Sequence, residues 1–370
     1  MRLLFFPGGT WLWGQELVTL SLMKALRADG HDCRAVISGW NDGHYERLLT
    51  EAGVVHHAVK LGRVYISRPA WTLDTLANLS AAAAQVRRIV RDFKPDAVVI
   101  SALDQATLLS VCLPREIPLV LHAHSTPDRI YRTLLGKLLL RRVACIVAIS
   151  RFVETELRCS SAQLRNIATV HNGVEVDGAE VPERSRPSGA LRIGIVGQIL
   201  PRKRHGTLIE AAEKMRRAGA AAFEIHVYVD DSGDLAGRLK ALVASKGLSD
   251  IFRWHGFVSS HREMFGSLDV VVAPSVDEPF GLTVLEAGRF GLPVVAARSG
   301  AFPEIVEHDQ TGLLFEPGDA DAMAAALMQL TNGRLRRRLG QAAAAHVRAN
   351  FSIEKMAREF VAAAVKPFLV

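Results

Sequence analysis

The chain has 370 residues, of which 49% are hydrophobic, and this length and composition favour two domains because single cores seldom grow beyond ~250 to 300 residues. Its formal charge of +7 suits an acidic partner, but no basic tract interleaved with aromatic residues is present, which argues against a nucleic-acid reader. No apolar run approaches the ~18 residues of a membrane-spanning helix and the apolar N-terminal segment is too short for a signal peptide, so a cytoplasmic location is expected.

The first residues predict a strand, a glycine-rich loop, a helix and a second strand. Apolar residues 2–6 precede the loop PGGTWLWGQE, a helical pattern then runs to Gly30, and CRAVIS resumes an apolar strand. The loop lacks the G-x-G-x-x-G spacing of a dinucleotide fingerprint, which disfavours a nicotinamide enzyme. Gly8 and Gly9 either approach a ligand or only form a tight turn, and the sequence leaves both readings open.

Residues 44–62 predict a further helix and strand, and 73–93 predict a long amphipathic helix. Two buried strands follow at 96–101 and 118–124, and the second ends in the histidines His122 and His124. Open α/β sheets bind ligands at the carboxyl ends of their strands, so His124 is a candidate ligand contact. The alternative is a histidine whose polar atoms are satisfied within the fold.

The segment 129–142, RIYRTLLGKLLLRR, combines five basic residues with a stripe of leucines. One interpretation is a helix that makes a peripheral contact with an anionic membrane on its cytoplasmic side. The favoured interpretation is an ordinary domain helix that buries Leu134, Leu135 and Leu138 and leaves its basic groups in water.

A strand and a helix capped by Ser150 are predicted within 144–157, and the charged stretch 177–190, which contains proline and glycine, resembles a linker. We therefore expect an N-terminal domain at 1–176, a linker at 177–190, a second domain at 191–350, and a last helix at 351–370.

The second domain also begins with a strand, a glycine turn and a helix. Gly194 and Gly197 would permit close approach of the backbone to a ligand. Arg202 and Lys203 stand just before the helix, where basic residues oppose the helix dipole, so they indicate a negatively charged partner such as a diphosphate.

Metal binding is not expected. The acidic turn after strand 223–229 holds Asp230 and Asp231, but no second ligand cluster is visible and a solvated turn is the simpler interpretation. The four cysteines form no C-x-x-C pair and are expected to be reduced and buried. No cofactor is indicated either.

The stretch 269–289, DVVVAPSVDEPFGLTVLEAGR, contains the most informative pattern. Val270 to Val272 predict a buried strand, and the sequence from Leu282 predicts a helix that begins after Gly281. A helix that begins at the end of a strand presents unpaired N–H groups and a positive dipole to an anion. Glu278 on the loop and Glu286 on the helix would both point into the same cleft, where carboxylates accept hydrogen bonds from ligand hydroxyls.

The segment E-P-F-G-L-T-V-L-E resembles the E-x7-E element of the retaining glycosyltransferases of the GT-B fold, family four. P-R-K at 201–203 and H-A-H-S-T at 122–126 are similar to two other segments of that family. Two departures are Gln198, where many members have arginine, and Arg204, where they have glycine. The first puts one phosphate contact in doubt.

The resemblance implies an α/β GT-B fold with two Rossmann-like domains of parallel sheets facing across a cleft, the last helix packing on the first domain. It implies retaining transfer of a hexose from a nucleotide-diphosphate sugar, UDP-sugar first and GDP-sugar next, to an unidentified hydroxyl acceptor, without a metal. Glu278 would contact the hexose and Glu286 the ribose, while Arg202 and Lys203 stabilise the diphosphate. The other implied donor contacts are Gly9, Gly197, Val258, Phe280, Gly281, Leu282 and Thr283, and those on the acceptor side are Gly8, Gly9 and His124.

Three alternatives remain open at this stage. A nucleotide-sugar epimerase or a phosphorylase can be built on the same two-domain plan, and a non-catalytic binding protein can keep the fold.

Overall fold

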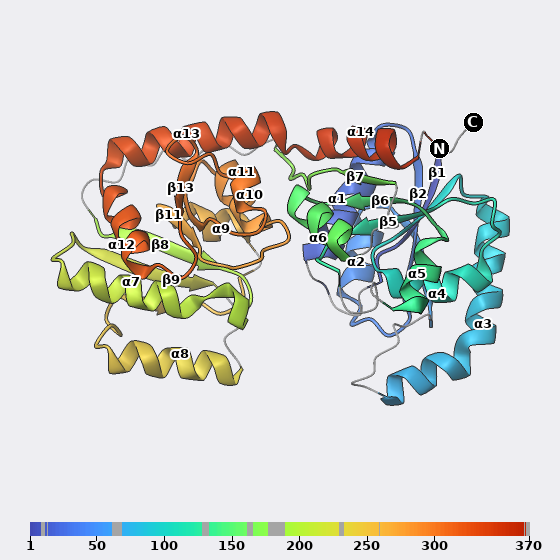
Figure 1. The fold of residues 1–370 in the computed structure, drawn as a ribbon, viewed down its shortest axis with the longest axis horizontal. Coiled ribbons are helices and arrows are strands. Elements are labelled where there is room, and N and C mark those ends of the chain that lie inside the picture. Colours follow the sequence, from blue (N-terminus) through green and yellow to red (C-terminus); the bar gives the residue numbers. More distant parts are fainter. Residues whose placement is uncertain are drawn as a thin grey trace. The chain divides into compact units, whose positions relative to one another are not determined.

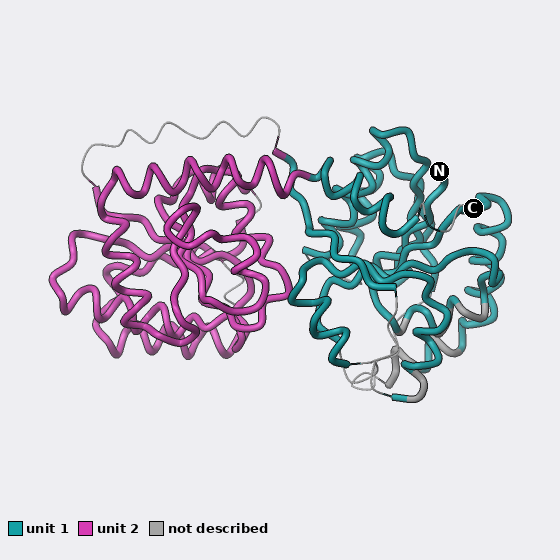
Figure 2. The backbone as a smooth tube through the Cα atoms, turned by 45° about the horizontal axis from the view of Figure 1, so that its top comes forward, with its two compact units in different colours: residues 1–175, 353–370 teal, residues 176–352 magenta. Residues whose placement is uncertain are grey.

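The computed structural model describes residues 1–8, 12, 14–60, 69–127, 133–160, 166–176, 189–228, 233–258, 260–365 and 367. The chain forms two compact units, one of residues 1–175 with 353–370 and one of residues 176–352 (Figure 2). Each unit is a parallel sheet flanked by helices (Figure 1). The predicted Asp230 and Asp231, the segment 129–132 and most of the predicted linker lie outside the described residues.

The first unit contains a seven-stranded sheet with the order β3-β2-β1-β4-β5-β6-β7. Its strands are β1 (Arg2–Phe6), β2 (Asp32–Ser38), β3 (Val55–Val59), β4 (Ala97–Ile100), β5 (Leu119–Ala123), β6 (Val143–Ala148) and β7 (Ile167–Thr169). Its helices are α1 (Gly14–Ala28), α2 (His44–Glu51), α3 (Pro69–Phe93), α4 (Leu103–Cys112), α5 (Leu134–Leu140), α6 (Arg151–Ser160) and α14 (Ile353–Ala364). The last of these contacts α1 and β6.

The second unit contains a six-stranded sheet with the order β10-β9-β8-β11-β12-β13. Its strands are β8 (Leu191–Val196), β9 (Phe223–Tyr228), β10 (Phe252–Trp254), β11 (Val270–Ala273), β12 (Val294–Ala297) and β13 (Gly312–Phe315). Its helices are the 3-10 turn η2 (Pro201–Lys203), α7 (His205–Arg217), α8 (Asp234–Ser245), α9 (His261–Gly266), α10 (Leu282–Arg289), α11 (Phe302–Ile305), α12 (Ala320–Gln329) and α13 (Gly333–Asn350).

The central strands are apolar along their whole length because helices cover both faces of a parallel sheet. Every residue of β4, β5, β11 and β12 is buried. In each unit the first strand pairs with the second on one side and with the fourth on the other. This order is that of a Rossmann-like sheet, and it places a topological switch point between β1 and β4 and another between β8 and β11. The α/β class predicted from the sequence is confirmed in both units.

Helices α12 and α13 are separate, because the Asn332 side chain accepts hydrogen bonds from the N–H groups of Arg334 and Leu335 and begins α13. Two local predictions differ from the structure. Among the leucines of α5 whose side chains the structure describes, Leu139 is buried, whereas Leu138, predicted to be buried, is 51% exposed. The side chains of Leu134 and Leu135, predicted to be buried as well, lie outside the described part. The fourth cysteine, Cys159, is exposed, while the other three are buried.

Among the described residues, no helix combines the length and apolar character needed to cross a membrane.

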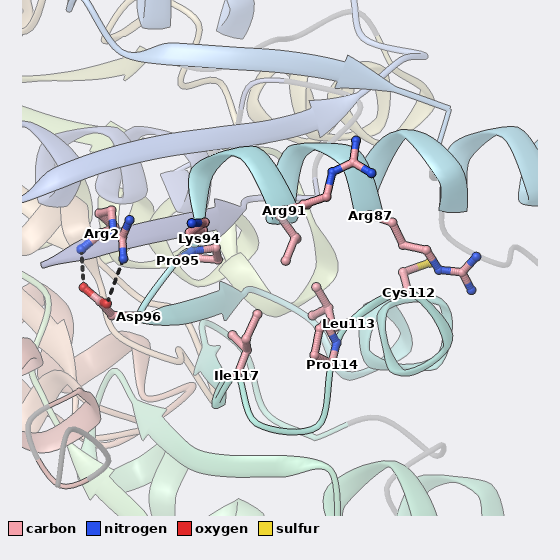
Figure 3. A pocket seen from close by; sticks show the side chains of 11 residues that line it. Arg2, Arg87, Arg91, Lys94, Pro95, Asp96, Cys112, Leu113, Pro114 and Ile117 are labelled. Atoms are coloured by element: carbon pink, nitrogen blue, oxygen red, sulfur yellow. Dashed lines mark hydrogen bonds and ion pairs between the residues drawn. The ribbon is translucent and has the colours of Figure 1, made fainter.

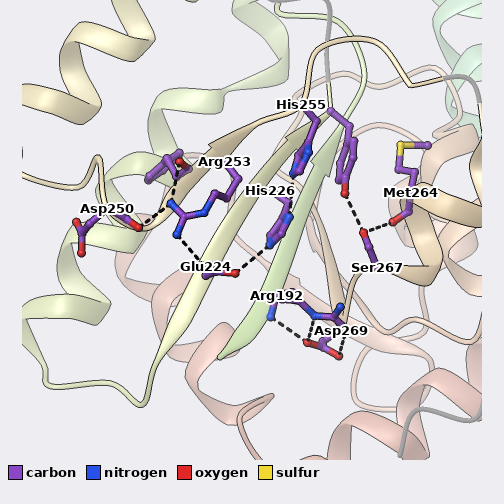
Figure 4. Close-up of polar contacts among 11 residues, drawn as sticks. Arg192, Glu224, His226, Asp250, Arg253, His255, Met264, Ser267 and Asp269 are labelled. Atoms are coloured by element: carbon purple, nitrogen blue, oxygen red, sulfur yellow. Dashed lines mark hydrogen bonds and ion pairs between the residues drawn. The ribbon is translucent and has the colours of Figure 1, made fainter. Parts of the chain in front are cut away.

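An ion pair at the amino ends of two central strands holds the second sheet in register (Figure 4). The Arg192 guanidinium donates to both carboxylate oxygens of Asp269, each at 3.1 Å, and the Arg192 N–H donates to Asp269 Oδ2 at 3.0 Å. Burial raises the pKa of Asp269, but the hydrogen bonds from Arg192 outweigh this effect and leave that pKa below its ordinary value. The pair therefore stabilises the alignment of β8 with β11.

Candidate functional site

Three loops meet at the carboxyl edge of the second sheet. They follow the adjacent strands β8, β11 and β12 and span 197–204, 274–281 and 298–301. The Val276 N–H donates to the Arg202 carbonyl at 2.9 Å, which joins the first two loops. Because β8 and β11 flank the switch point, this is the edge where open α/β sheets bind their ligands.

Arg202 and Lys203 converge on one carboxylate oxygen. Arg202 Nη1 lies 2.9 Å and Lys203 Nζ 2.8 Å from Glu278 Oε2. The Glu278 side chain is 10% exposed and Lys203 19%, whereas Arg202 is 43% exposed. The structure thus brings together three residues singled out from the sequence, at a point where two cations face one carboxylate. The surplus positive charge can receive an anion.

The loop that carries Glu278 rests on the loop after β12. The Ala301 N–H donates to the Glu278 carbonyl at 2.9 Å, and the Asp277 N–H donates to Ser299 Oγ at 3.0 Å. Gly300 has φ +58°, and a Cβ at this position would lie 2.5 Å from the Glu278 nitrogen and still closer to its carbonyl oxygen. The sequence reasoning missed this support. The signal in the sequence was the serine and glycine of the segment RSG that follows the apolar strand VVAA.

Helix α10 begins at Leu282, as predicted. Gly281 caps it with φ +106°, and a Cβ there would lie 2.5 Å from Phe302 Cε1, so the loop has no room for a larger residue. Phe280 is buried, which anchors the chain just before the cap. The first turn of α10, including Leu282 and Thr283, directs N–H groups out of the amino end of the helix, where anions are favoured.

Glu286 lies on α10 with two basic neighbours. His261 Nδ1 on α9 is 3.3 Å from Glu286 Oε2, and Arg289 Nη1 is 3.7 Å from it. Attraction to the Glu286 carboxylate raises the pKa of His261. Val258 lies between β10 and α9, four residues after Trp254. Neither His261 nor Arg289 was predicted, because the pairing depends on how α9 and α10 pack.

The two glycines that were assigned to ligand approach have different surroundings. Gly194 lies within β8, where a Cβ would collide with the Leu268 side chain, so this glycine serves packing and the prediction of ligand contact is wrong. Gly197 follows β8 with φ +127° and has no atom within 4 Å of an added Cβ. Only Gly197 keeps the open position that was predicted.

Arg204 occupies the position where the resembled family has glycine. It adopts φ +51°, in the left-handed region that favours glycine. With His205, Gly206 and Thr207 it lines a cavity of about 250 Å³ beside α7. Burial, with a smaller effect from the charge of Lys203, lowers the pKa of His205 to about 4.

Gly8 of the first unit follows β1 and lies against the Gln105 side chain, which a Cβ at Gly8 would overlap. Gln105 Oε1 in turn accepts hydrogen bonds from the N–H groups of Ser101 and Ala102, at 3.0 and 3.3 Å. These contacts join the loops after β1 and β4. Gly9 lies outside the described residues.

His122 and His124 are adjacent, with ring centroids 4.0 Å apart. His122 is fully buried against Phe360, and within the described residues neither of its ring nitrogens has a hydrogen-bond partner. Burial lowers the pKa of His122 to about 3. Burial and the neighbouring His122 lower the pKa of His124. The His124 residue is partly exposed, but its Nε2 atom is buried and has no hydrogen-bond partner among the described groups. Both imidazoles are therefore neutral near pH 7.

The part of the chain that the structure describes contains no cluster of three or more His, Cys, Asp or Glu side chains that could hold a metal ion.

Two family models match consecutive parts of the chain. Residues 13–177 match "Glycosyltransferase Family 4", and residues 179–346 match "Glycosyl transferases group 1".

Curated relatives match shorter stretches. The amylovoran biosynthesis glycosyltransferase AmsK of Erwinia amylovora is 29% identical over 196 residues, 51% of this chain and 47% of that protein. The lipopolysaccharide core biosynthesis mannosyltransferase LpcC of Rhizobium leguminosarum bv. viciae is 37% identical over 123 residues, 33% and 35% of the two chains. The matched region thus spans about half the length of these relatives or less.

Solved structures match over nearly the whole chain. A glycosyltransferase from Rickettsia africae has a TM-score of 0.80 at 20% identity, covering 100% of this chain and 98% of that one. Anabaena HepE in complex with UDP-glucose has a TM-score of 0.79 at 18% identity, covering 98% of both chains. At these identities the likeness establishes the fold.

Proposed function

Because the chain belongs to the family 4, group 1 glycosyltransferases of the GT-B fold, we propose that it transfers a hexose from a nucleotide-diphosphate sugar to a hydroxyl acceptor. The convergence of Arg202 and Lys203 on Glu278 at the switch point of the second sheet is the observation that carries this proposal. A group with two phosphates would compete for both cations. Glu278 would then accept hydrogen bonds from the hexose hydroxyls beside that diphosphate.

Retention of configuration is part of the proposal. A carboxylate that accepts hydrogen bonds from two cations is stabilised as an acceptor, which weakens it as a nucleophile. Glu278 therefore suits orientation of the sugar better than covalent attack. The acceptor would attack on the face from which the diphosphate leaves. Arg202, Lys203 and the N–H groups at the start of α10 would stabilise the charge on the departing phosphate without a metal or cofactor.

The donor is proposed to be a UDP-sugar, with a GDP-sugar next. The complex of HepE with UDP-glucose supports a uridine nucleotide on this fold. Glu286 would accept hydrogen bonds from the ribose, and the backbone near Val258, before α9, would meet the base. Gly197 leaves open space after β8 for the donor.

The acceptor side is proposed to lie on the first unit, at Gly8, Gly9 and His124. His124 is neutral near pH 7, so it can either donate or accept one hydrogen bond with a hydroxyl. The names of AmsK and LpcC favour an acceptor in polysaccharide or lipopolysaccharide synthesis. We also propose that the enzyme is cytoplasmic and makes a peripheral membrane contact through 129–142. The exposed Leu138 is available for this contact.

The test begins with a thermal-shift screen of UDP-, GDP- and ADP-sugars, followed by assay of donor hydrolysis and transfer. Lys203→Ala should lower kcat/KM on the order of 100-fold, because it removes one cation from the leaving diphosphate. Lys214→Ala is the matched control, since Lys214 on α7 pairs with Asp321 instead, at 2.7 Å.

Unchanged kinetics in Lys203→Ala would refute the diphosphate role. If no donor is hydrolysed or transferred above background, a non-catalytic binding protein is the better description. Interconversion of the donor sugar without transfer would instead identify an epimerase.

A further inference from the structure

A cavity of about 710 Å³ lies in the first unit between α3 and α4 (Figure 3). Arg2 begins β1, Asp96 directly precedes β4, and Ile117 stands two residues before β5. The cavity thus opens at the amino edge of the sheet. Gly8 and His124 follow the carboxyl ends of β1 and β5, so roughly 15 Å of strand separates the two edges. This cavity is a different place from the proposed acceptor side.

The floor of the cavity is apolar. Val90 on α3 and the end of α4, with Cys112 and Leu113, form buried parts of it, and Pro114 and Ile117 continue the surface toward β5. The Arg142 guanidinium donates to the carbonyls of Pro114 and Ile117 at 2.8 and 3.2 Å, which stabilises this turn. The floor is therefore a fixed surface on which an alkyl chain can lie.

The rim is cationic. Its basic residues are Arg2, Arg87, Arg91 and Lys94, and its one acidic residue is Asp96. Asp96 already accepts a hydrogen bond from the Arg2 N–H at 2.7 Å, and its other oxygen lies 3.8 Å from the Arg2 guanidinium. Arg87 extends from α3 toward Cys112, and Lys94 stands at the other end of the rim (Figure 3). Arg91 Nε lies 3.5 Å from Asp92 Oδ1, so part of the positive charge is already compensated. The rim still keeps an excess of positive charge over an apolar floor.

Helix ends explain only part of this arrangement. Cations are favoured near the carboxyl ends of α3 at Phe93 and of α4 at Cys112, where the helix dipoles are negative. That effect accounts for Arg91 and Lys94, and the contacts with Asp96 account for Arg2, but neither explains the apolar floor beneath the cations. The combination matches a ligand with an anionic head and an apolar tail.

We propose that this cavity binds one molecule of a single-chain anionic amphiphile, of the alkyl phosphate class. The phosphate would lie at the end of the rim formed by Lys94 and Arg2, and the alkyl chain on Val90, Leu113 and Ile117. The site is independent of the sugar-transfer reaction.

Isothermal titration of the full chain with octyl phosphate, below the concentration at which it forms micelles, tests the proposal. One molecule should bind per chain, and hexyl phosphate should bind more weakly, by up to roughly fourfold per lost methylene. Inorganic phosphate, which lacks the chain, and octyl glucoside, which lacks the charge, should each bind at least tenfold more weakly. Equal binding of either probe would overturn the proposal, as would binding only to vesicles of phosphatidic acid.

Variants locate the site. Arg2→Gln combined with Lys94→Gln should weaken octyl phosphate binding at least tenfold. The control Arg47→Gln with Arg88→Gln removes the same charge from α2 and α3 outside the cavity and should bind as the unmodified protein does. Ile117→Ser should reduce the difference between octyl and hexyl phosphate while the phosphate contacts remain. Unchanged affinity in the first double variant, with its circular dichroism intact, would exclude this cavity.

Discussion

At the scale of single residues, the two glutamates of the candidate site differ in their partners. Glu278 faces Arg202 and Lys203, both suited to phosphate, whereas Glu286 faces His261 and Arg289. Each carboxylate therefore has two basic neighbours. A sugar hydroxyl bound at either position adds to an arrangement that is already formed.

Glu286→Gln should weaken binding of a free nucleoside diphosphate roughly tenfold or more, because a hydrogen bond to a charged acceptor contributes about 1.5 to 3 kcal/mol. Calorimetry measures this change. The same substitution should lower the pKa of His261, which the Glu286 carboxylate raises, and an imidazole titration by NMR would detect the change. Glu263→Gln on α9 removes a comparable charge nearby and is the control. An unaltered dissociation constant would count against ribose recognition.

At the scale of elements, the site depends on one loop supporting another. The loop after β12 makes hydrogen bonds with the Glu278 loop through the Ala301 N–H and Ser299 Oγ, and its Gly300 lies against the Glu278 backbone. Helix α10 is held in the same way, with Gly281 against Phe302. The predicted residues on the Glu278 loop and on α10 are positioned by these two glycines, because a larger residue at either glycine would prevent the close approach of the neighbouring chain.

Gly300→Ala should lower both thermal stability and kcat/KM, since the new methyl group would displace the Glu278 backbone. Gly247→Ala is a control for backbone strain, because Gly247 has φ +65° but open space around an added Cβ. The difference in melting temperature between the two variants separates the effect of the collision with the Glu278 backbone from the effect of placing alanine at a positive φ. Equal effects in both would show that the Glu278 loop tolerates the added methyl group.

At the scale of the whole molecule, both units contain histidines whose pKa values burial lowers to different degrees, among them His122 and His124 in the first and His205, His226 and the more exposed His255 in the second. His226 Nδ1 and His255 Nε2 lie 3.0 Å apart (Figure 4), so one ring must accept from the other. Below pH 6.5 the unfolded chain binds more protons at these groups than the folded chain. The contribution of these histidines to the free energy of unfolding is therefore fully present above pH 6.5, and it is lost as the pH falls below that value. His261, whose pKa is raised, acts in the opposite sense.

The free energy of unfolding, measured by urea titration, should fall steeply from pH 6.5 to pH 5, with each strongly shifted histidine contributing about 1.4 kcal/mol per pH unit. His122→Leu should reduce this slope by about that amount, because the pKa of His122 is lowered to about 3. It should not destabilise the protein at pH 7.5, since the imidazole it removes has no hydrogen-bond partner within the described part of the chain. A slope unchanged by the substitution would contradict the burial of a neutral His122.

The sequence alone determined the α/β class, the start of α10, and the candidates Arg202, Lys203, Glu278 and Glu286. Apolar strands, breaker residues and helix caps act over a few neighbours, so they can be recognised in the chain itself. Only the tertiary structure decided that Glu278 meets both cations, that Gly194 packs on Leu268, and that His261 reaches Glu286. Those contacts join residues brought together by the strand order and by helix packing, which no local pattern encodes.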